Sequence, residues 1–261
     1  MCYNKYSRPD AGGCAWFIGG ATRMEIRMLQ GVEGAGKAAG SAVVIDVFRA
    51  FSLENYLFAA GVSRILPVGR EETARELKRR MPEALLVGER LGVKLPGFDY
   101  GNSPWQIREA SLPGKTIIHT TSAGTQGIAA AAAAGADEIL PSAMVNARAV
   151  AEYLRKKQPA VVSICCMGLN GREEAPEDTI CGNWIREWLC GRTPDIERDL
   201  ARLREDPTVA RFFDPDKQWV FPEGDYHMST DADRFDQVLS AVRLDEDIFE
   251  TKVVDKGGKA L

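Results

Sequence analysis

Residues 41–52, SAVVIDVFRAFS, decide the fold that the sequence predicts. Four of the five residues at 42–46 are apolar and three are β-branched, which is typical of a strand buried on both faces in a parallel sheet. Asp46 ends this strand, at the edge of the sheet where α/β proteins bind ligands, and Arg49 follows three residues later. A carboxylate can hold a cation and an arginine can bind a phosphate through two hydrogen bonds. We therefore expect a ligand site around Asp46 and Arg49.

Length and composition exclude several classes of protein. The chain of 261 residues can bury a full core, as one α/β domain or as two lobes. Its net charge of −4 gives no basic surface for nucleic acid, and no apolar run approaches the roughly 18 residues of a membrane-spanning helix. Six irregularly spaced cysteines match neither a zinc site nor a disulfide framework. Reduced thiols and a cytoplasmic location are expected.

Short apolar segments alternate with helical ones along most of the chain. This alternation predicts an α/β protein with a mixed, largely parallel sheet flanked by helices. The predicted strands after the first are 64–68, 84–87, 116–119, 138–140 and 160–166, and the predicted helices are 51–60, 71–80, 126–134, 146–157 and one that runs through Trp188. From about residue 191 the pattern becomes more irregular: 195–214 reads as helical, 215–231 as a loop, and 242–254 as an extended strip.

The first forty residues carry two weaker signals. Residues 1–23 lack a regular pattern and are expected to be a poorly ordered N-terminal extension, with the patterned chain beginning at Met24. Residues 31–38, GVEGAGKA, nearly match a phosphate-binding P-loop. Ala38 lacks the hydroxyl that would contact magnesium, and a strand follows within four residues instead of a long helix. A flexible connection is therefore expected at 31–38.

Two polar segments in the first half of the chain are candidates for the site, and each has a plainer explanation. Glu89 and Arg90 follow the strand at 84–87, and glycines at 88 and 92 permit close approach of a ligand to the backbone. A surface ion pair between them is the alternative. Asn102 and Ser103 lie in the turn FDYGNSP, where they either form the turn or orient a substrate.

Two further segments precede helices. Residues 120–125, TTSAGT, lead from a strand into a helix, so their hydroxyl and backbone N–H groups suit a phosphate or sulfonate; a plain N-cap cluster is the alternative. Glu177 and Asp178 follow Pro176, where acids stabilise the first turn of a helix or supply a magnesium ligand and a general acid or base.

Taken together, these segments resemble the 2-phosphosulfolactate phosphatase family of coenzyme M biosynthesis. The resemblance extends from about Met24 to the C-terminus, and its motifs occur in the order and spacing of the family. They are DVFRAFS at 46–52, GERLG at 88–92, FDYGNSP at 98–104, TTSAGT at 120–125 and PEDTICG at 176–182. Phe51 stands where many members have threonine, and Ala123 where many have asparagine. Both departures remove a polar group and bear on the choice of substrate.

The resemblance implies a function for residues 24–261 as one catalytic domain. It implies a magnesium-dependent phosphatase that hydrolyses the small phosphoester 2-phospho-3-sulfolactate to 3-sulfolactate and phosphate, with no nucleic-acid or membrane partner. A homo-oligomer is left open. Three alternatives remain: a phosphatase for a different small anionic phosphoester, a non-catalytic sensor of an anionic metabolite, and a nucleotide-dependent transferase that uses the glycine-rich segment at 31–38.

The chemistry of the candidate residues predicts a role for each of them in such a phosphatase. Asp46, Glu89 and Asp178 are expected to hold Mg²⁺. Arg49 and Arg90 are expected to neutralise phosphate or sulfonate, and Glu177 or Asp178 to act as general acid or base. Asn102 and Ser103 would orient the substrate. The predicted anion cradle consists of Thr120, Thr121, Ser122, Gly124 and Thr125. Replacing Asp46 by Asn or Arg49 by Ala is expected to abolish most activity and leave the fold intact.

Overall fold

The structure is a computed structural model that describes residues 16–18 and 22–254. Most of the predicted N-terminal extension, residues 1–15 and 19–21, lies outside the described residues. In the described part of the predicted extension, β1 (Trp16–Ile18) pairs antiparallel with the start of β2 (Thr22–Gln30). The regular chain therefore begins slightly before Met24.

The first sheet has five strands in the order β1-β2-β9-β3-β8. From β2 to β8 every neighbouring pair is parallel. All five residues of β3 are buried, which confirms the prediction of a strand covered on both faces. The remaining strands of this sheet are β3 (Ser41–Ile45), β8 (Glu138–Ser142) and β9 (Val161–Cys166).

The second sheet has six strands in the order β10-β11-β4-β7-β5-β6. Its centre, β4-β7-β5, is parallel, and its edge strands are antiparallel. The α/β class and the parallel character are thus confirmed, but the strands divide between two sheets. The six strands are β4 (Arg64–Pro67), β5 (Leu85–Arg90), β6 (Val93–Lys94), β7 (Thr116–Thr120), β10 (Val238–Arg243) and β11 (Phe249–Val254).

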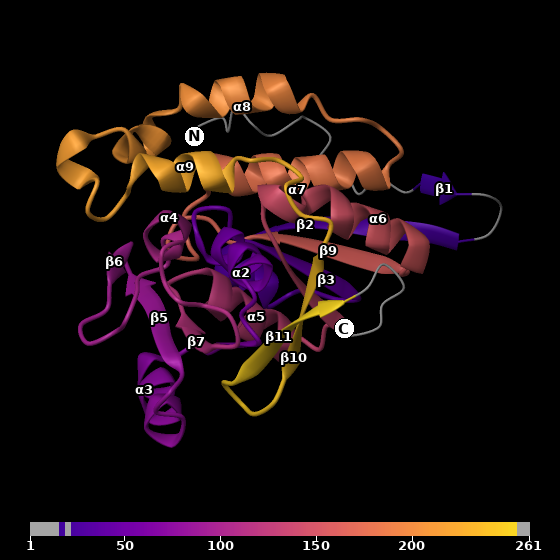
Figure 1. Ribbon diagram of the computed structural model, residues 1–261. Helices are drawn as coiled ribbons and strands as arrows, with labels where there is room; N and C mark the ends of the chain where they lie inside the picture. The colour runs from indigo at the N-terminus through magenta and orange to yellow at the C-terminus, as the bar shows by residue number, and fades with distance from the viewer. Residues whose placement is uncertain (1–15, 19–21, 255–261) are drawn as a thin grey trace.

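Helices cover both faces of each sheet (Figure 1). On the first sheet, α7 (Pro176–Leu189) packs against β9 on the face opposite α5 (Gly124–Ala133), and α6 (Ala147–Lys157) lies beside α7. Gly182 of α7 lies against Ile164, while Gly127 of α5 lies against Val44. The short helix α1 (Gly31–Ala35) contacts α5, so residues 31–35 of the segment predicted as a flexible connection are helical.

On the second sheet, α2 and α3 pack on opposite faces. Leu53 of α2 (Ala50–Ala59) joins a buried cluster with Ile117, and Leu77 of α3 (Glu71–Arg80) joins another with Ile118. Successive residues of β7 point to opposite faces, so the helices lie on either side of the strand. Because α2 follows β3 directly, it links the end of the first sheet to the second.

In the C-terminal portion, α8 (Ile196–Arg204) packs against α7, α9 (Glu223–Ser229) packs against α2, and the chain ends in the β10–β11 hairpin (Figure 1). Helix α8 confirms the first half of the helical prediction for 195–214, and the second half contains a 3₁₀ helix at 207–212. The loop prediction for 215–231 is wrong for α9, and the extended strip begins earlier than predicted, at Val238. Helix α9 follows Pro222 and contains Gly224, residues that usually mark loops. Short connecting helices are α4 (Pro104–Ile107), η1 (Met144–Asn146), η2 (Pro207–Phe212) and η3 (Pro215–Lys217). None of the helices in the described part of the chain is long and apolar enough to span a bilayer.

Candidate active site

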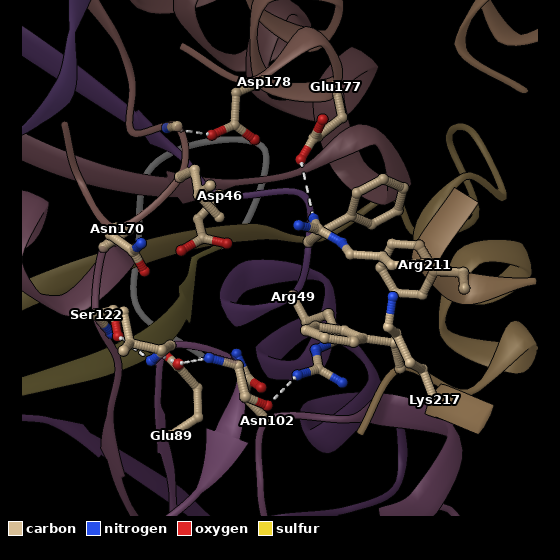
Figure 2. Close-up of a pocket in the computed structure, with 18 residues that line it drawn as sticks. Asp46, Arg49, Glu89, Asn102, Ser122, Asn170, Glu177, Asp178, Arg211 and Lys217 are labelled. Atoms are coloured by element: carbon tan, nitrogen blue, oxygen red, sulfur yellow. Dashed lines mark hydrogen bonds and ion pairs between the residues drawn. The ribbon is translucent and has the colours of Figure 1, made fainter. Parts of the chain in front are cut away.

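A cavity of about 350 Å³ lies where the carboxyl ends of the two sheets meet. Asp46 enters it from the end of β3, Gly168 from the loop after β9, and Glu89 from β5 of the second sheet. Part of its wall comes from the C-terminal segment between α8 and α9 (Figure 2). The other lining residues are Phe48, Arg49, Leu91, Gly92, Asn102, Ser122, Ala123, Leu169, Asn170, Glu177, Asp178, Arg211, Phe212, Lys217 and Phe221.

Asp46 is held by the backbone on both of its oxygens. Its Oδ1 accepts a hydrogen bond from the N–H of Ala50 at 3.1 Å, and its Oδ2 from the N–H of Gly124 at 2.9 Å. A Cβ atom at position 124 would lie 2.9 Å from Asp46 Oδ2, so glycine permits this approach. Burial, with repulsion from Glu89, raises the pKa of Asp46 to about 6. The carboxylate is thus fixed in place and readily neutralised by a proton or a cation.

Asp178 is anchored in a similar way at the start of α7. Its Oδ1 accepts from the N–H of Val47 at 2.8 Å and its Oδ2 from the N–H of Gly168 at 2.7 Å. These bonds connect the loops that follow β3 and β9. Burial and the neighbouring carboxylates of Asp46 and Glu177 raise the pKa of Asp178 well above its usual range.

The carboxylate of Glu177 has fewer polar partners than that of the adjacent Asp178. Its Oε1 lies 3.9 Å from a nitrogen of Arg211, and its buried Oε2 has no hydrogen-bond partner among the described residues. Burial raises the pKa of Glu177 to about 7, although the positive charge of Arg211 opposes the shift. Glu177 can therefore hold a proton inside the cavity near neutral pH.

The carboxylate of Glu89 connects the turn after β5 with the segment that follows β7. Its Oε1 accepts from the N–H of Ser122 at 2.7 Å, and its Oε2 accepts from the N–H of Gly92 at 2.6 Å and from the hydroxyl of Ser122 at 3.2 Å. Backbone N–H groups of the predicted anion cradle are thus directed at Glu89 and at Asp46. Within the protein itself, the 120–125 segment binds carboxylates.

The acidic side of the cavity suits a hard cation through two carboxylates. Among residues 16–18 and 22–254, no group of three or more His, Cys, Asp or Glu side chains is arranged to hold a metal ion. The assignment of Asp46, Glu89 and Asp178 as Mg²⁺ ligands therefore stays a prediction. Mg²⁺ commonly takes one or two carboxylates and fills its other positions with water and phosphate oxygens. Asp46 and Asp178 each keep lone pairs beyond their backbone hydrogen bonds, and their mutual repulsion would be relieved by a cation. Their chemistry therefore fits Mg²⁺.

Arg49 is one half of a buried ion pair that the sequence did not indicate. One terminal nitrogen donates to Asp225 Oδ2 at 2.8 Å and to the carbonyl of Val220 at 2.5 Å, and the other donates to the carbonyl of Gly92 at 2.8 Å. Both charged side chains are almost fully buried. Asp225 also accepts from the hydroxyl of Ser103 at 2.6 Å. Arg49 therefore ties the end of β3 to the C-terminal segment as well as lining the cavity.

Several other predicted site residues lie beside the cavity without lining it. Arg90 points to the opposite side of β5 from Glu89 and donates to Thr120 Oγ1 at 3.0 Å. Thr121 and Thr125 bond to one another through hydroxyl and backbone groups. Ser103 caps α4 and binds Asp225. We therefore revise the roles of these residues, and of Gly124, from substrate contact to support of the cavity wall.

Asn102 and Ser122 do line the cavity, as predicted for substrate-binding residues. Asn102 Oδ1 is buried without a hydrogen-bond partner among the described residues, so it can accept a hydrogen bond from a ligand. Ala123 also lines the cavity, whereas Phe51 is fully buried beside Gly124. Of the two departures from the family motifs, the one at Ala123 is therefore in direct reach of a ligand.

Among the charged residues that line the cavity, Arg211 and Lys217 are the two that the sequence did not indicate. Both come from the short helices η2 and η3, in a charged segment without a recognisable motif. The guanidinium of Arg211 lies 5.1 Å from the ring centre of Phe221, the same distance as that of Arg49. The recurrence of aromatic residues beside basic ones in 211–221 was the available signal.

The chain is similar to known proteins of one family. A model of the 2-phosphosulpholactate phosphatase family matches residues 28–215. Similar curated proteins are the probable 2-phosphosulfolactate phosphatases of Symbiobacterium thermophilum, 37% identical over 60% of this chain and 66% of the relative, and of Thermotoga petrophila, 39% identical over 63% of this chain and 70% of the relative. That of Carboxydothermus hydrogenoformans is 43% identical over 47% of this chain and 50% of the relative.

The chain thus spans about two thirds of the length of the first two relatives. The family match extends over most of the 261 residues and includes all the lining residues from Asp46 to Phe212. It covers the parallel strands β3, β8 and β9 of the first sheet and β4, β5 and β7 of the second, together with the acidic side of the cavity. On this evidence the chain belongs to the 2-phosphosulpholactate phosphatase family.

Proposed function

We propose that the protein is a magnesium-dependent phosphatase that hydrolyses 2-phospho-3-sulfolactate to 3-sulfolactate and phosphate. The observation that carries this proposal is the meeting of Asp46, Asp178 and Glu177 in one cavity with the cationic Arg49. A phosphomonoester needs both halves of such a site, since catalysis of phosphoryl transfer rests on positioning and on charge stabilisation. The relatives named as probable 2-phosphosulfolactate phosphatases support the substrate.

In this proposal, each group of the chain has a separate task. Bound Mg²⁺ would polarise the phosphoryl oxygens and activate a water molecule. Asp46 and Asp178 would hold the ion, each kept in orientation by two backbone N–H groups. Arg49 makes three hydrogen bonds to the protein, fewer than the five N–H groups of a guanidinium, so it can still donate to the phosphate.

Glu177 is proposed as the general acid. Its Oε2 is buried without a hydrogen-bond partner among the described residues, and the side chain lines the cavity. Protonated Glu177 would donate its proton to the alkoxide oxygen of 3-sulfolactate as the bond from phosphorus to that oxygen breaks. Water supplies the oxygen that phosphate gains, so the reaction is balanced as a hydrolysis. Asn102 and Ser122 would orient the substrate.

Phosphate release from a panel of phosphoesters tests this function. The panel contains 2-phosphosulfolactate, phosphoglycolate and p-nitrophenyl phosphate, each measured with Mg²⁺, with EDTA, and with Mg²⁺ restored. We expect Mg²⁺-dependent release that is fastest with 2-phosphosulfolactate. Mg²⁺-dependent release that is faster with another ester would keep the reaction and replace the substrate. A folded protein that releases no phosphate from any ester would contradict the proposal and favour a sensor of anionic metabolites. Participation in coenzyme M biosynthesis stays a prediction of the family resemblance, a cytoplasmic location stays a prediction of the cysteine pattern, and a homo-oligomer stays open.

The buried carboxyl of Glu177 predicts a pH-dependent stability for the metal-free protein. A pKa raised to about 7 in the folded state favours folding fully below the ordinary pKa of a glutamate, near 4.5, and this contribution disappears as the pH rises through 7. Glu177→Gln has no proton to lose. We therefore expect the melting temperature of the variant to rise relative to wild type between pH 5 and pH 8.5.

Thermal unfolding in EDTA at several pH values measures this difference. The exposed Glu83 provides a matched control, because Glu83→Gln should shift the melting temperature equally at all pH values. A difference between Glu177→Gln and wild type that stays constant from pH 5 to pH 8.5 would show that Glu177 does not titrate in the folded protein as described.

A further inference from the structure

The cavity is divided by charge. Asp46 and Glu89 lie on one side, and Arg211 and Lys217 lie across from them on the wall built by the C-terminal segment (Figure 2). A cation held by the carboxylates would draw the phosphate of a substrate to the acidic side. The basic side then faces the alcohol part of the same molecule.

Arg211 lacks the partners that a partly buried guanidinium normally has. Its Nε is buried without a hydrogen-bond partner among the described residues, and its nearest acid, Glu177, is 3.9 Å away. The flat faces of the guanidinium are supported by Phe212 and Phe221, whose ring centres lie 5.2 and 5.1 Å from its central carbon. Burial, together with the nearby charge of Arg49, lowers the pKa of Arg211. An anion in the cavity would supply the missing hydrogen bonds.

Lys217 adds a second positive charge on the same wall. Its ammonium pairs with Asp214 at 3.0 Å and remains half exposed, so it can reorient toward a ligand. By contrast, Arg49 is neutralised by the buried carboxylate of Asp225. Of the three cationic residues that line the cavity, Arg211 and Lys217 can therefore pair with a bound anion more readily than Arg49 can.

We propose that Arg211 and Lys217 form a specificity site for the acidic group, sulfonate or carboxylate, on the alcohol part of the substrate. This inference rests on the proposed phosphatase function and adds the orientation of the substrate to it. The phosphate lies on the Asp46 side, and the acidic group lies against Arg211. Phosphoesters of neutral alcohols lack that contact and are poorer substrates for this reason.

Variants of the two residues, measured on four substrates, test the proposal. The substrates are 2-phosphosulfolactate, 2-phospholactate without the sulfonate, the phosphoester of 2-hydroxyethanesulfonate without the carboxylate, and p-nitrophenyl phosphate without either. We expect Arg211→Gln to lower kcat/KM for 2-phosphosulfolactate about 10- to 100-fold, the loss of a charge-assisted hydrogen bond, mainly through KM. The rate with p-nitrophenyl phosphate should change less than about 3-fold. Whichever single-acid ester shows the larger loss identifies the group that Arg211 binds.

Two further variants separate this role from others. The replacement Lys217→Gln leaves the ion pair of Glu177 with Arg211 in place. If this variant loses kcat/KM only on substrates that carry an acidic group, an indirect effect through the Glu177 carboxyl is excluded. Arg204 is exposed, lies 3.4 Å from the ring centre of Phe213 and does not line the cavity; Arg204→Gln should leave all four rates unchanged. Equal losses on all four substrates for Arg211→Gln would overturn the proposal and assign Arg211 to the phosphate or to Glu177.

Calorimetric binding of 3-sulfolactate keeps the inference distinct from the phosphatase function. We expect wild type to bind 3-sulfolactate at least about 10-fold more tightly than Arg211→Gln does, whether or not wild type hydrolyses any phosphoester. If wild type releases no phosphate from any ester but retains this difference in binding, the phosphatase proposal fails and the anion site stands. Equal affinities for the two proteins would overturn the anion site.

Discussion

Asp46→Asn is expected to reduce phosphate release by about 10²- to 10³-fold, in line with the loss of a single transition-state group. Asp46 is one of two carboxylates proposed to hold Mg²⁺, and an amide keeps its size but loses its charge. Both of its oxygens accept backbone N–H groups, so one N–H loses its acceptor in the variant. That loss costs about 1–3 kcal/mol, partly offset by removing a buried charge beside Glu89.

The rate of the Asp46→Asn variant reports on the mechanism only if the variant is folded. Circular dichroism and the melting temperature establish that the variant is folded, and Mg²⁺ titration by calorimetry should show weaker binding than in wild type. Asp137 is an exposed aspartate outside the cavity, so Asp137→Asn is expected to keep full activity. A folded Asp46→Asn protein with near-normal turnover would remove Asp46 from the mechanism.

Arg49→Ala is expected to lose about 3–5 kcal/mol of unfolding free energy, because it leaves Asp225 buried without its ion partner. The carbonyls of Val220 and Gly92 lose their donor as well. The sequence reading expected this variant to lose activity with an intact fold; the buried ion pair makes loss of stability the primary effect. Denaturant unfolding followed by tryptophan fluorescence measures it.

Two controls isolate the buried pair. Arg64 forms a partly exposed ion pair with Glu250 at 2.6 Å, and Arg64→Ala should cost less than about 1 kcal/mol. The double replacement of Arg49 by Met and Asp225 by Leu removes both charges and should cost less than Arg49→Ala alone. An Arg49→Ala protein as stable as wild type would contradict the structural role of the pair.

Much of the acidic half of the cavity was predictable from the sequence. Asp46 ends an unmistakably buried strand, and Glu89 lies in another strand near its carboxyl end. Strand periodicity does not reveal which strands share a sheet, since that depends on long-range pairing. The division into two sheets was therefore missed, although the strand ends still converge.

The supporting roles in the 120–125 segment could not be predicted for a different reason. Hydroxyl and N–H groups at a helix start suit any anion, and the sequence does not say whether the anion is a ligand or a carboxylate of the protein. Here Ser122 and Gly124 donate to Glu89 and Asp46. The local composition indicated that the segment binds an anionic group. Whether that group is a ligand or a carboxylate of the protein depends on tertiary contacts.

The basic half of the cavity was hidden by the irregular C-terminal portion. Arg211 and Lys217 lie on 3₁₀ helices of six and three residues, which are too short to give a hydrophobic period. Asp225 lies in α9, where Pro222 and Gly224 gave a loop signature. Their positions depend on packing of the aromatic residues around Phe212 and Phe221, which only the folded chain brings together.

A crystal structure of the protein with Mg²⁺ and 3-sulfolactate tests the central claim most directly, namely that this cavity is the catalytic site and is divided by charge. The account predicts Mg²⁺ bound to Asp46 and Asp178, with the hydroxyl of 3-sulfolactate on the acidic side and an acidic group against Arg211 and Lys217. Mg²⁺ and product bound outside this cavity, or product bound with its acidic groups against the carboxylates, would contradict it.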